Sequence, residues 1–223
     1  MSRLLFLGLL IFSTVLSAAQ TALSDTTDHS APVVTFTLDF PDSQPEHYSI
    51  RVPAAGSGHY ESTGRLTADS EVTDSFDFDF TITAETRAKI FALAAKTGYF
   101  KKDLESHKNV AFTGKKTLSY RDANRAGDAT FNYSTMPVVQ ELTALFQNLS
   151  ATLEFGHRLN YDRRYQKLAL DEELKRMQAM ADSKMLVEVA AIQPILEQIV
   201  ADSSVVNVAR ARAQRLLGAE NTR

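Results

Sequence analysis

Hydrophobic and polar residues alternate with a period of two along the first half of the chain. The alternation is clearest at residues 34–40 and 76–82, where an apolar side chain occupies every second position. A period of two is typical of a strand that buries one face. Shorter runs of the same kind predict further strands at residues 47–52, 59–65, 110–112, 117–121 and 129–133. The runs at 110–112 and 117–121 are expected to form a hairpin.

The period changes to that of a helix twice in the same part of the chain. Thr83 is expected to cap a first helix that ends at Gly98. Ser134 or Thr135 is expected to cap a second helix, which Gly156 would break, with continuation of this helix through residues 159–161 as the alternative. Its apolar stripe comprises Val138, Leu142, Leu145, Leu149 and Leu153.

These elements predict an α+β domain at residues 33–155, with a mostly antiparallel sheet and two helices packed on one face. Residues 156–223 show no strand pattern, so they predict an all-helical C-terminal region. Helices are expected at residues 161–181 and 184–201, the second kinked at Pro194. A last helix is expected to be capped by Ser203 or Ser204 and to end at Gly218.

The N-terminus has the pattern of a secretory signal. Arg3 precedes an apolar run at residues 4–16, and small residues follow at 17–19. The run is too short to span a bilayer comfortably, which takes about 20 apolar residues. We therefore predict a signal peptide at residues 1–19 and a flexible leader at 20–32, with an uncleaved anchor or a buried helix as alternatives. The mature protein is expected to be soluble and periplasmic or extracellular, without a transmembrane segment.

Composition excludes several classes of function. The chain has no cysteine, which rules out disulfides, thiolate nucleophiles, cysteine-ligated zinc and lipid attachment at an N-terminal cysteine. The formal net charge is −3, and no dense Lys/Arg run is present. We therefore expect no nucleic-acid partner.

Candidate chemistry is sparse. Asp77 and Asp79 share one side of a predicted strand, with Asp74 nearby, and such carboxylates are suited to calcium. The spacing of a calcium-binding loop is absent, however, and alternation with phenylalanine explains these residues as the exposed side of the strand. Residues 114–117 resemble a phosphate-binding loop only superficially, because Asn109 replaces the first glycine and Lys116 the hydroxyl residue. We predict a turn with two solvated lysines there, and no metal or cofactor.

Two groups of arginines suggest an interaction surface. One lies on the last helix and the other lies beside tyrosines after residue 160, and such surfaces are enriched at protein interfaces. Stabilisation of the helix end by the basic groups, and packing of the tyrosines at the junction, are the alternatives. The candidate residues are Tyr161, Arg163, Arg164, Arg210, Arg212 and Arg215.

The last two predicted helices resemble a single HEAT-repeat hairpin. The matching residues are Ile195 to Ile199, Asp202, Val208 to Arg210, Ala213, Leu216 and Leu217. The resemblance covers about 35 residues and implies that Asp202 and Arg210 help to fix the stacking of the helices. Because one repeat cannot bury its own faces, a helix pair packed on the α+β domain is the alternative. The front part resembles, in layout only, small uncharacterised exported bacterial domains.

These observations favour a non-enzymatic protein-interaction module of the bacterial envelope, with another envelope protein as its partner. A hydrolase with catalytic residues dispersed along the sequence is one alternative, because no local motif identifies a catalytic set. A small-molecule-binding protein with a cleft between sheet and helices is the other.

Overall fold

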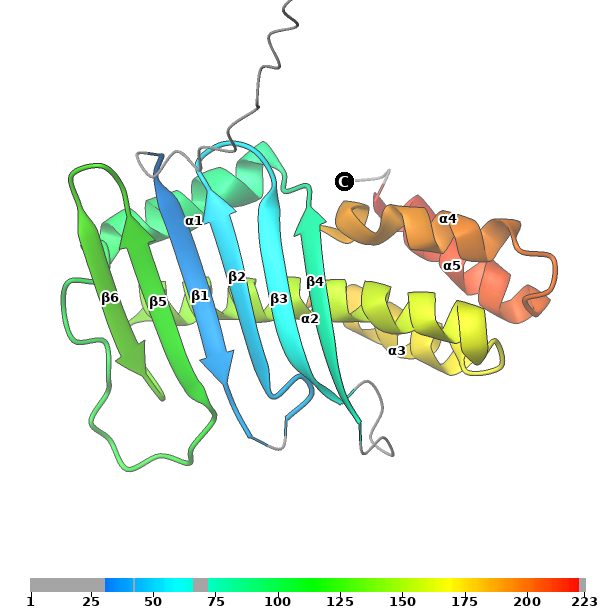
Figure 1. Ribbon diagram of the computed structural model, residues 1–223, viewed down its shortest axis with the longest axis horizontal. Coiled ribbons are helices and arrows are strands. Elements are labelled where there is room, and N and C mark those ends of the chain that lie inside the picture. The colour runs from blue at the N-terminus through cyan, green and yellow to red at the C-terminus, as the bar shows by residue number, and fades with distance from the viewer. Residues whose placement is uncertain (1–30, 42, 66–71, 221–223) are drawn as a thin grey trace, which may run out of the picture.

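The computed structural model describes residues 31–41, 43–65 and 72–220, with side chains to Gly218 (Figure 1). The predicted signal peptide at 1–19 and most of the predicted leader at 20–32 lie outside these residues. Within the described part of the chain, no helix has both the length and the hydrophobicity needed to cross a membrane.

The described residues have an α+β fold built on one six-stranded antiparallel sheet. The strands are arranged in the order β4-β3-β2-β1-β5-β6, so β4 and β6 form its edges. The strands are β1 (Val33–Asp39), β2 (His47–Pro53), β3 (Gly58–Arg65), β4 (Thr73–Phe80), β5 (Lys115–Arg121) and β6 (Ala126–Phe131).

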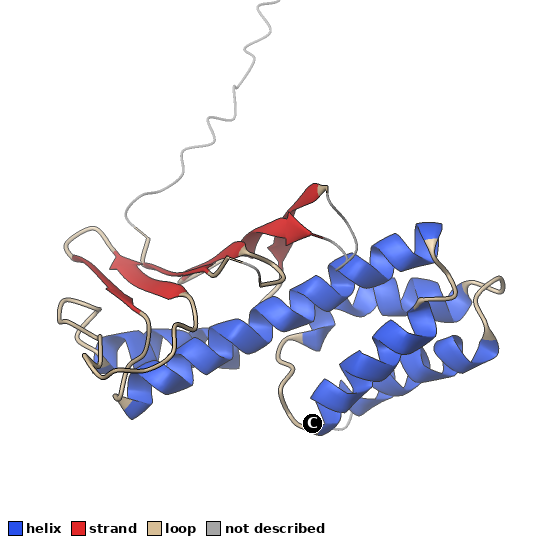
Figure 2. Ribbon diagram, turned by 90° about the horizontal axis from the view of Figure 1, so that it is seen from below, coloured by secondary structure: helices blue, strands red, loops and turns tan. Residues whose placement is uncertain are grey.

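The period of two places the large apolar side chains on one face of the sheet. Phe36, Ile50 and Tyr60 lie opposite one another on β1, β2 and β3, and all three are fully buried. Helices α1 (Ala84–Lys96) and α2 (Pro137–Tyr165) cover this face (Figure 2). No described helix covers the other face, which carries Ser, Thr, His and acidic side chains.

The sequence predicted the N-terminal cap of α1 correctly but not that of α2. Thr83 caps α1 as expected, because its Oγ1 accepts a hydrogen bond from the Thr86 N–H at 3.2 Å. The prediction that Ser134 or Thr135 caps α2 is wrong, because the N-cap residue is Met136. Pro137 occupies the first turn, where its missing N–H costs no helical hydrogen bond.

The predicted helix break at Gly156 is also wrong. Helix α2 runs for 29 residues and passes through Gly156 without interruption. The glycine instead permits a close approach, because a Cβ at this position would lie 2.5 Å from Cγ2 of Ile192. A single helix therefore continues across the boundary predicted between residues 155 and 156.

The segment before β5 contains no hairpin. Residues 110–112 have no strand partner, so the strand predicted there is wrong. Lys116 satisfies the local carbonyl groups instead, with Nζ donating to the carbonyl oxygens of Thr113, Gly114 and Asn132 at 2.9, 3.0 and 2.8 Å. Lys116 is buried at 5 % exposure, which corrects its prediction as a solvated residue.

The C-terminal region is helical, as predicted, with different boundaries. The predicted helix at 161–181 is divided between the end of α2 and α3, and Pro194 lies in the first turn of α4 and produces no kink. Gly218 lies inside the last helix and does not end it. The elements are α3 (Leu170–Asp182), the short 3-10 helix η1 (Val189–Ile192), α4 (Gln193–Ala201) and α5 (Asn207–Glu220).

Candidate functional site

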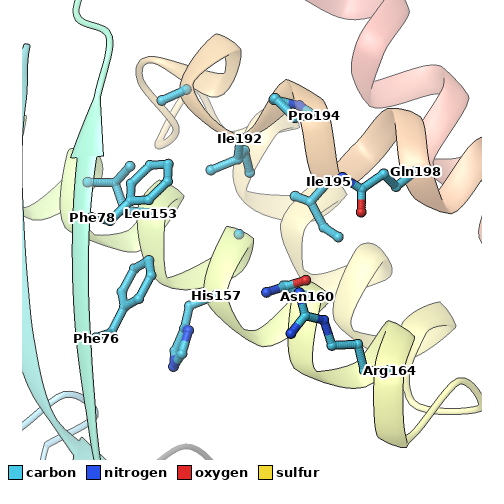
Figure 3. A pocket seen from close by; sticks show the side chains of 12 residues that line it. Phe76, Phe78, Leu153, His157, Asn160, Arg164, Ile192, Pro194, Ile195 and Gln198 are labelled. Carbon is cyan, nitrogen blue, oxygen red and sulfur yellow. The ribbon is translucent and has the colours of Figure 1, made fainter.

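A groove separates the edge strand β4 from the helical C-terminal region. It encloses about 310 Å³ and is bounded by β4, by the C-terminal half of α2, and by η1 with α4 (Figure 3). Pockets that hold small ligands have volumes from about 300 Å³ upwards. Its lining residues are Phe76, Phe78, Leu153, Gly156, His157, Asn160, Arg164, Ala191, Ile192, Pro194, Ile195 and Gln198.

The floor of the groove is apolar. Phe76 and Phe78 project from β4 on the side that faces the helices, and their rings stack with centroids 5.6 Å apart. Ile192 and Ile195 from η1 and α4 line the opposite wall, and Leu153 from α2 also lines the groove. The two phenylalanines continue the buried face of the sheet, but they are only partly buried because the groove lies over them.

A histidine from α2 fixes one side of the floor. The His157 ring stacks on Phe76 with ring centroids 4.1 Å apart. Its Nε2 lies 2.6 Å from a carboxylate oxygen of Asp74, which belongs to β4. This pair joins the edge strand directly to α2. Phe76 is therefore held by its own strand and by the His157 ring that stacks on it.

Polar side chains gather at the other end of the groove. Asn160 and Arg164 lie one turn apart on α2, and Gln198 comes from α4 (Figure 3). None of the three side chains makes a hydrogen bond or ion pair with another described residue. This end of the groove therefore offers free donors, including one cation, beside an apolar floor.

The groove also borders an unpaired strand edge. Strand β4 pairs with β3 on one side, and no described strand lies on its other side. An edge of this kind presents backbone N–H and C=O groups that an additional strand can bind. The arrangement can therefore supply main-chain hydrogen bonds as well as apolar contact.

The chemistry of the lining favours binding over catalysis. The side chains that line the groove include no Ser, Thr, Tyr, Lys or carboxylate, so they contain no nucleophile for the histidine to activate. His157 is engaged with Asp74 and with the face of Phe76. This groove therefore has no constellation for hydrolysis among its described residues.

Three of the arginines predicted to form an interaction surface contact other parts of the same chain. Arg163 lies 3.9 Å from Asp202. Arg210 donates from Nε to the carbonyl oxygen of Val200 at 3.0 Å, and Arg212 donates from Nε to Asp171 at 2.7 Å. These contacts join α2, α3, α4 and α5.

The other three predicted residues have different surroundings. Arg164 lines the groove, and Arg215 is exposed on α5. The ring of Tyr161 lies against that of Tyr165, with centroids 5.1 Å apart. The structure therefore does not bring the six predicted residues together into one cluster.

The turn of the predicted HEAT-like hairpin is held from outside the hairpin. Lys167 donates to Asp202 at 3.0 Å, and Ser204 also bonds this carboxylate. Hydrogen bonds from Ser204 and Lys167 lower the pKa of Asp202 to about 2. Arg210 binds a backbone carbonyl and not Asp202. The resemblance to a HEAT repeat stays a prediction.

The acidic residues of β4 divide between the two faces of the sheet. Asp77 and Asp79 are exposed on the open face, whereas Asp74 lies on the helix side with His157. His59 and Glu61 on β3 lie directly opposite Asp79 and Asp77, although no motif in the sequence indicates them as candidate ligands. The sequence shows that His59 and Glu61 lie on the same side of a strand. It does not show that they face Asp79 and Asp77, because that depends on the register between β3 and β4.

Comparison with known proteins identifies no relative. No family model matches the sequence, and no curated protein or solved structure matches it. Any functional interpretation therefore depends on the chain's own geometry.

Proposed function

We propose that the protein is a non-enzymatic interaction module, exported to the bacterial envelope, which binds an extended segment of a partner protein in the groove beside β4. The observation that carries this proposal is the edge of β4, which no described strand pairs, next to an apolar groove whose polar end has no partner among the described residues. Strand addition to a sheet edge is a common mode of peptide recognition.

The strand edge would supply affinity with little dependence on the peptide's sequence. An added strand forms main-chain hydrogen bonds with β4, which is eight residues long. Because β4 is already held in the sheet by β3, and to α2 through Asp74 and His157, its edge is ordered before the peptide binds. A preformed edge reduces the entropy lost on binding.

The groove would supply selectivity. Alternate side chains of an added strand point to the same side, so every second residue of the peptide would face Phe76 and Phe78. Apolar residues fit there, because the opposite wall consists of Ile192, Pro194 and Ile195. Burial of apolar area contributes about 25 cal/mol per Å².

The polar end would select a carboxylate. Arg164 makes no ion pair with a described residue, and its guanidinium can bind a carboxylate with two parallel hydrogen bonds. Asn160 and Gln198 can donate to the same group. We therefore expect a peptide with alternating apolar residues followed by an acidic side chain or a free C-terminus.

The test is a selection of random ten-residue peptides on the immobilised chain without residues 1–19, followed by titration of the best synthetic peptide. We expect amides of β4 to gain protection from hydrogen exchange when the peptide binds. Ala191→Phe should weaken binding at least tenfold, because residue 191 lines the groove and the larger side chain fills it. Ala88→Phe, an equal change on the exposed side of α1, should leave affinity unchanged.

Two results would overturn the proposal. One is a selection that yields no peptide dependent on the groove, so that binding to Ala191→Phe equals binding to the parent. The other is binding that perturbs Phe76 and Phe78 without protecting any amide of β4. The second result would indicate a small amphipathic ligand in place of a strand.

A further inference from the structure

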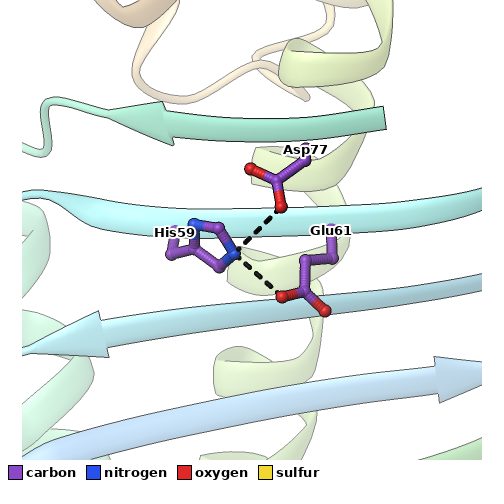
Figure 4. Close-up of side chains that lie close together, drawn as sticks. All are labelled: His59, Glu61 and Asp77. Carbon is purple, nitrogen blue, oxygen red and sulfur yellow. Dashed lines mark hydrogen bonds and ion pairs between the residues drawn. The ribbon is translucent and has the colours of Figure 1, made fainter. Parts of the chain in front are cut away.

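The open face of the sheet carries a compact group of nitrogen and oxygen ligands that is separate from the groove. The register pairs His59 with Asp79 and Glu61 with Asp77 across β3 and β4. Since residues two apart on a strand face the same way, all four side chains lie on one face. Figure 4 shows three of them, His59, Glu61 and Asp77. The group therefore follows directly from the pairing of these strands.

Three of these side chains converge on one point. His59 Nε2 lies 2.9 Å from Oε1 of Glu61 and 3.6 Å from Oδ2 of Asp77. One ligand atom from each residue lies within 4.8 Å of the others. Zinc binds nitrogen and oxygen at about 2.1 Å, so tetrahedral ligand atoms lie about 3.4 Å apart. The two separations from His59 Nε2, 2.9 and 3.6 Å, lie on either side of this value, and the three ligand atoms all lie within 4.8 Å of one another.

The fourth side chain orients the histidine. Asp79 lies with Oδ1 2.8 Å from Nδ1 of His59, on the other side of the ring from Glu61 and Asp77. A carboxylate that accepts the Nδ1 proton directs the Nε2 lone pair outward and is the usual support of a metal-binding histidine.

The balance of charge also favours a cation. Three carboxylates surround one imidazole, and the neighbouring residue of the same row on β2 is Arg51. No ion pair links Arg51 to these carboxylates among the described residues. A divalent ion would neutralise charge that the imidazole only partly offsets.

We propose that His59, Glu61 and Asp77 bind a divalent transition-metal ion of the zinc class, and that Asp79 positions the histidine. The mixture of one imidazole and two carboxylates suits such an ion better than calcium, which takes six to eight oxygen ligands. Water would complete the coordination, because the site faces solvent. The proposal is independent of the function proposed for the groove.

The test is a calorimetric titration of Zn²⁺ into the metal-free chain without residues 1–19, at pH 7.5 and with excess Ca²⁺ present. We expect one equivalent to bind and to raise the melting temperature. His59→Ala should weaken binding at least tenfold. Asp79→Asn should weaken it by about 10- to 100-fold while keeping the stoichiometry, as expected for a positioning residue.

His47→Ala is the matched control. His47 lies on β2 on the same open face and contacts a single carboxylate, with its Nδ1 2.6 Å from Asp39. This variant should bind zinc like the parent. All the substituted side chains are at least partly exposed, and circular dichroism checks the fold of each variant. The proposal is overturned if the parent binds no zinc under these conditions, or if His47→Ala and His59→Ala lower the affinity equally.

Discussion

Gly156 and Ile192 lie so close together that no side chain fits between them. A Cβ on residue 156 would be 2.5 Å from Cγ2 of Ile192. This contact brings η1 against α2 and determines the distance between the helical wall of the groove and its base.

Gly156→Ala should lower the free energy of unfolding by about 1–3 kcal/mol, because the added methyl overpacks the contact. Gly218→Ala is the matched control, since Gly218 is also helical and has no atom within 4 Å of the added methyl. That variant should be unchanged or more stable by up to about 1 kcal/mol. Urea unfolding measures the stability of both variants. Equal effects would contradict the close contact between Gly156 and Ile192 as the reason for the glycine.

Tyr60→Phe should destabilise the protein by about 1–3 kcal/mol. The buried hydroxyl of Tyr60 donates to Glu154 at 2.8 Å, and Ser62 donates to the same oxygen at 2.7 Å. Without the Tyr60 hydroxyl, the Glu154 carboxylate loses a hydrogen bond in a site that is 8 % exposed. Tyr133→Phe is the control, at an exposed residue whose hydroxyl accepts a hydrogen bond from Gln140 at 3.0 Å. It should change stability by less than about 0.5 kcal/mol in the same urea experiment.

Lys116→Met should cost about 2–4 kcal/mol, because three backbone carbonyls lose the ammonium group that binds them. Lys115→Met is the neighbouring control. The Lys115 side chain is 60 % exposed and lies 3.9 Å from Asp39, so its loss should change stability by less than about 0.5 kcal/mol. Thermal unfolding of the two variants gives the comparison. A larger loss for Lys115→Met would show that the ammonium of Lys116 does not hold this loop.

Asp162→Asn should stabilise the protein at pH 8 but not at pH 4. Burial, with Glu173 nearby, raises the pKa of Asp162 from 3.8 to about 6. A raised carboxyl pKa means that ionisation disfavours the folded state, so stability falls as pH rises through this interval and stays lower above it. Each pKa unit corresponds to about 1.4 kcal/mol, so we expect a gain of about 1–3 kcal/mol at pH 8.

Urea midpoints at pH 4 and pH 8 test this prediction. Asp128→Asn, at an exposed aspartate on β6, is the control and should show no such pH dependence. A gain for Asp162→Asn that is as large at pH 4 as at pH 8 would contradict the raised pKa.

The sheet was predictable because its signal is local. Alternation at residues 34–40 and 76–82 identified strands with a buried face, and the cap at Thr83 identified the start of α1. Both signals depend on residues within a few positions of one another in sequence.

The wrong predictions concern residues whose structural role depends on a partner far away in the sequence. Gly156 suggested a helix break, but glycine is required there because Ile192 leaves no room for a side chain. Lys116 suggested a solvated turn, but its ammonium reaches Asn132. The same limitation applies to the candidate sites. The groove requires β4 to be an edge strand, and the His59 cluster requires the β3–β4 register, neither of which the alternation specifies.

Because α2 is uninterrupted, the number of residues between two positions on it sets the relative directions of their side chains. Its earlier turns pack under the sheet through Phe146, and its later turns carry His157, Asn160 and Arg164. Each helical residue adds a rotation of about 100° and a rise of about 1.5 Å. One residue inserted between these parts would turn the polar end away from β4, whereas an insertion in the loop before β5 would leave the groove unchanged. The spacing inside α2 is therefore as much a determinant of the groove as the side chains that line it.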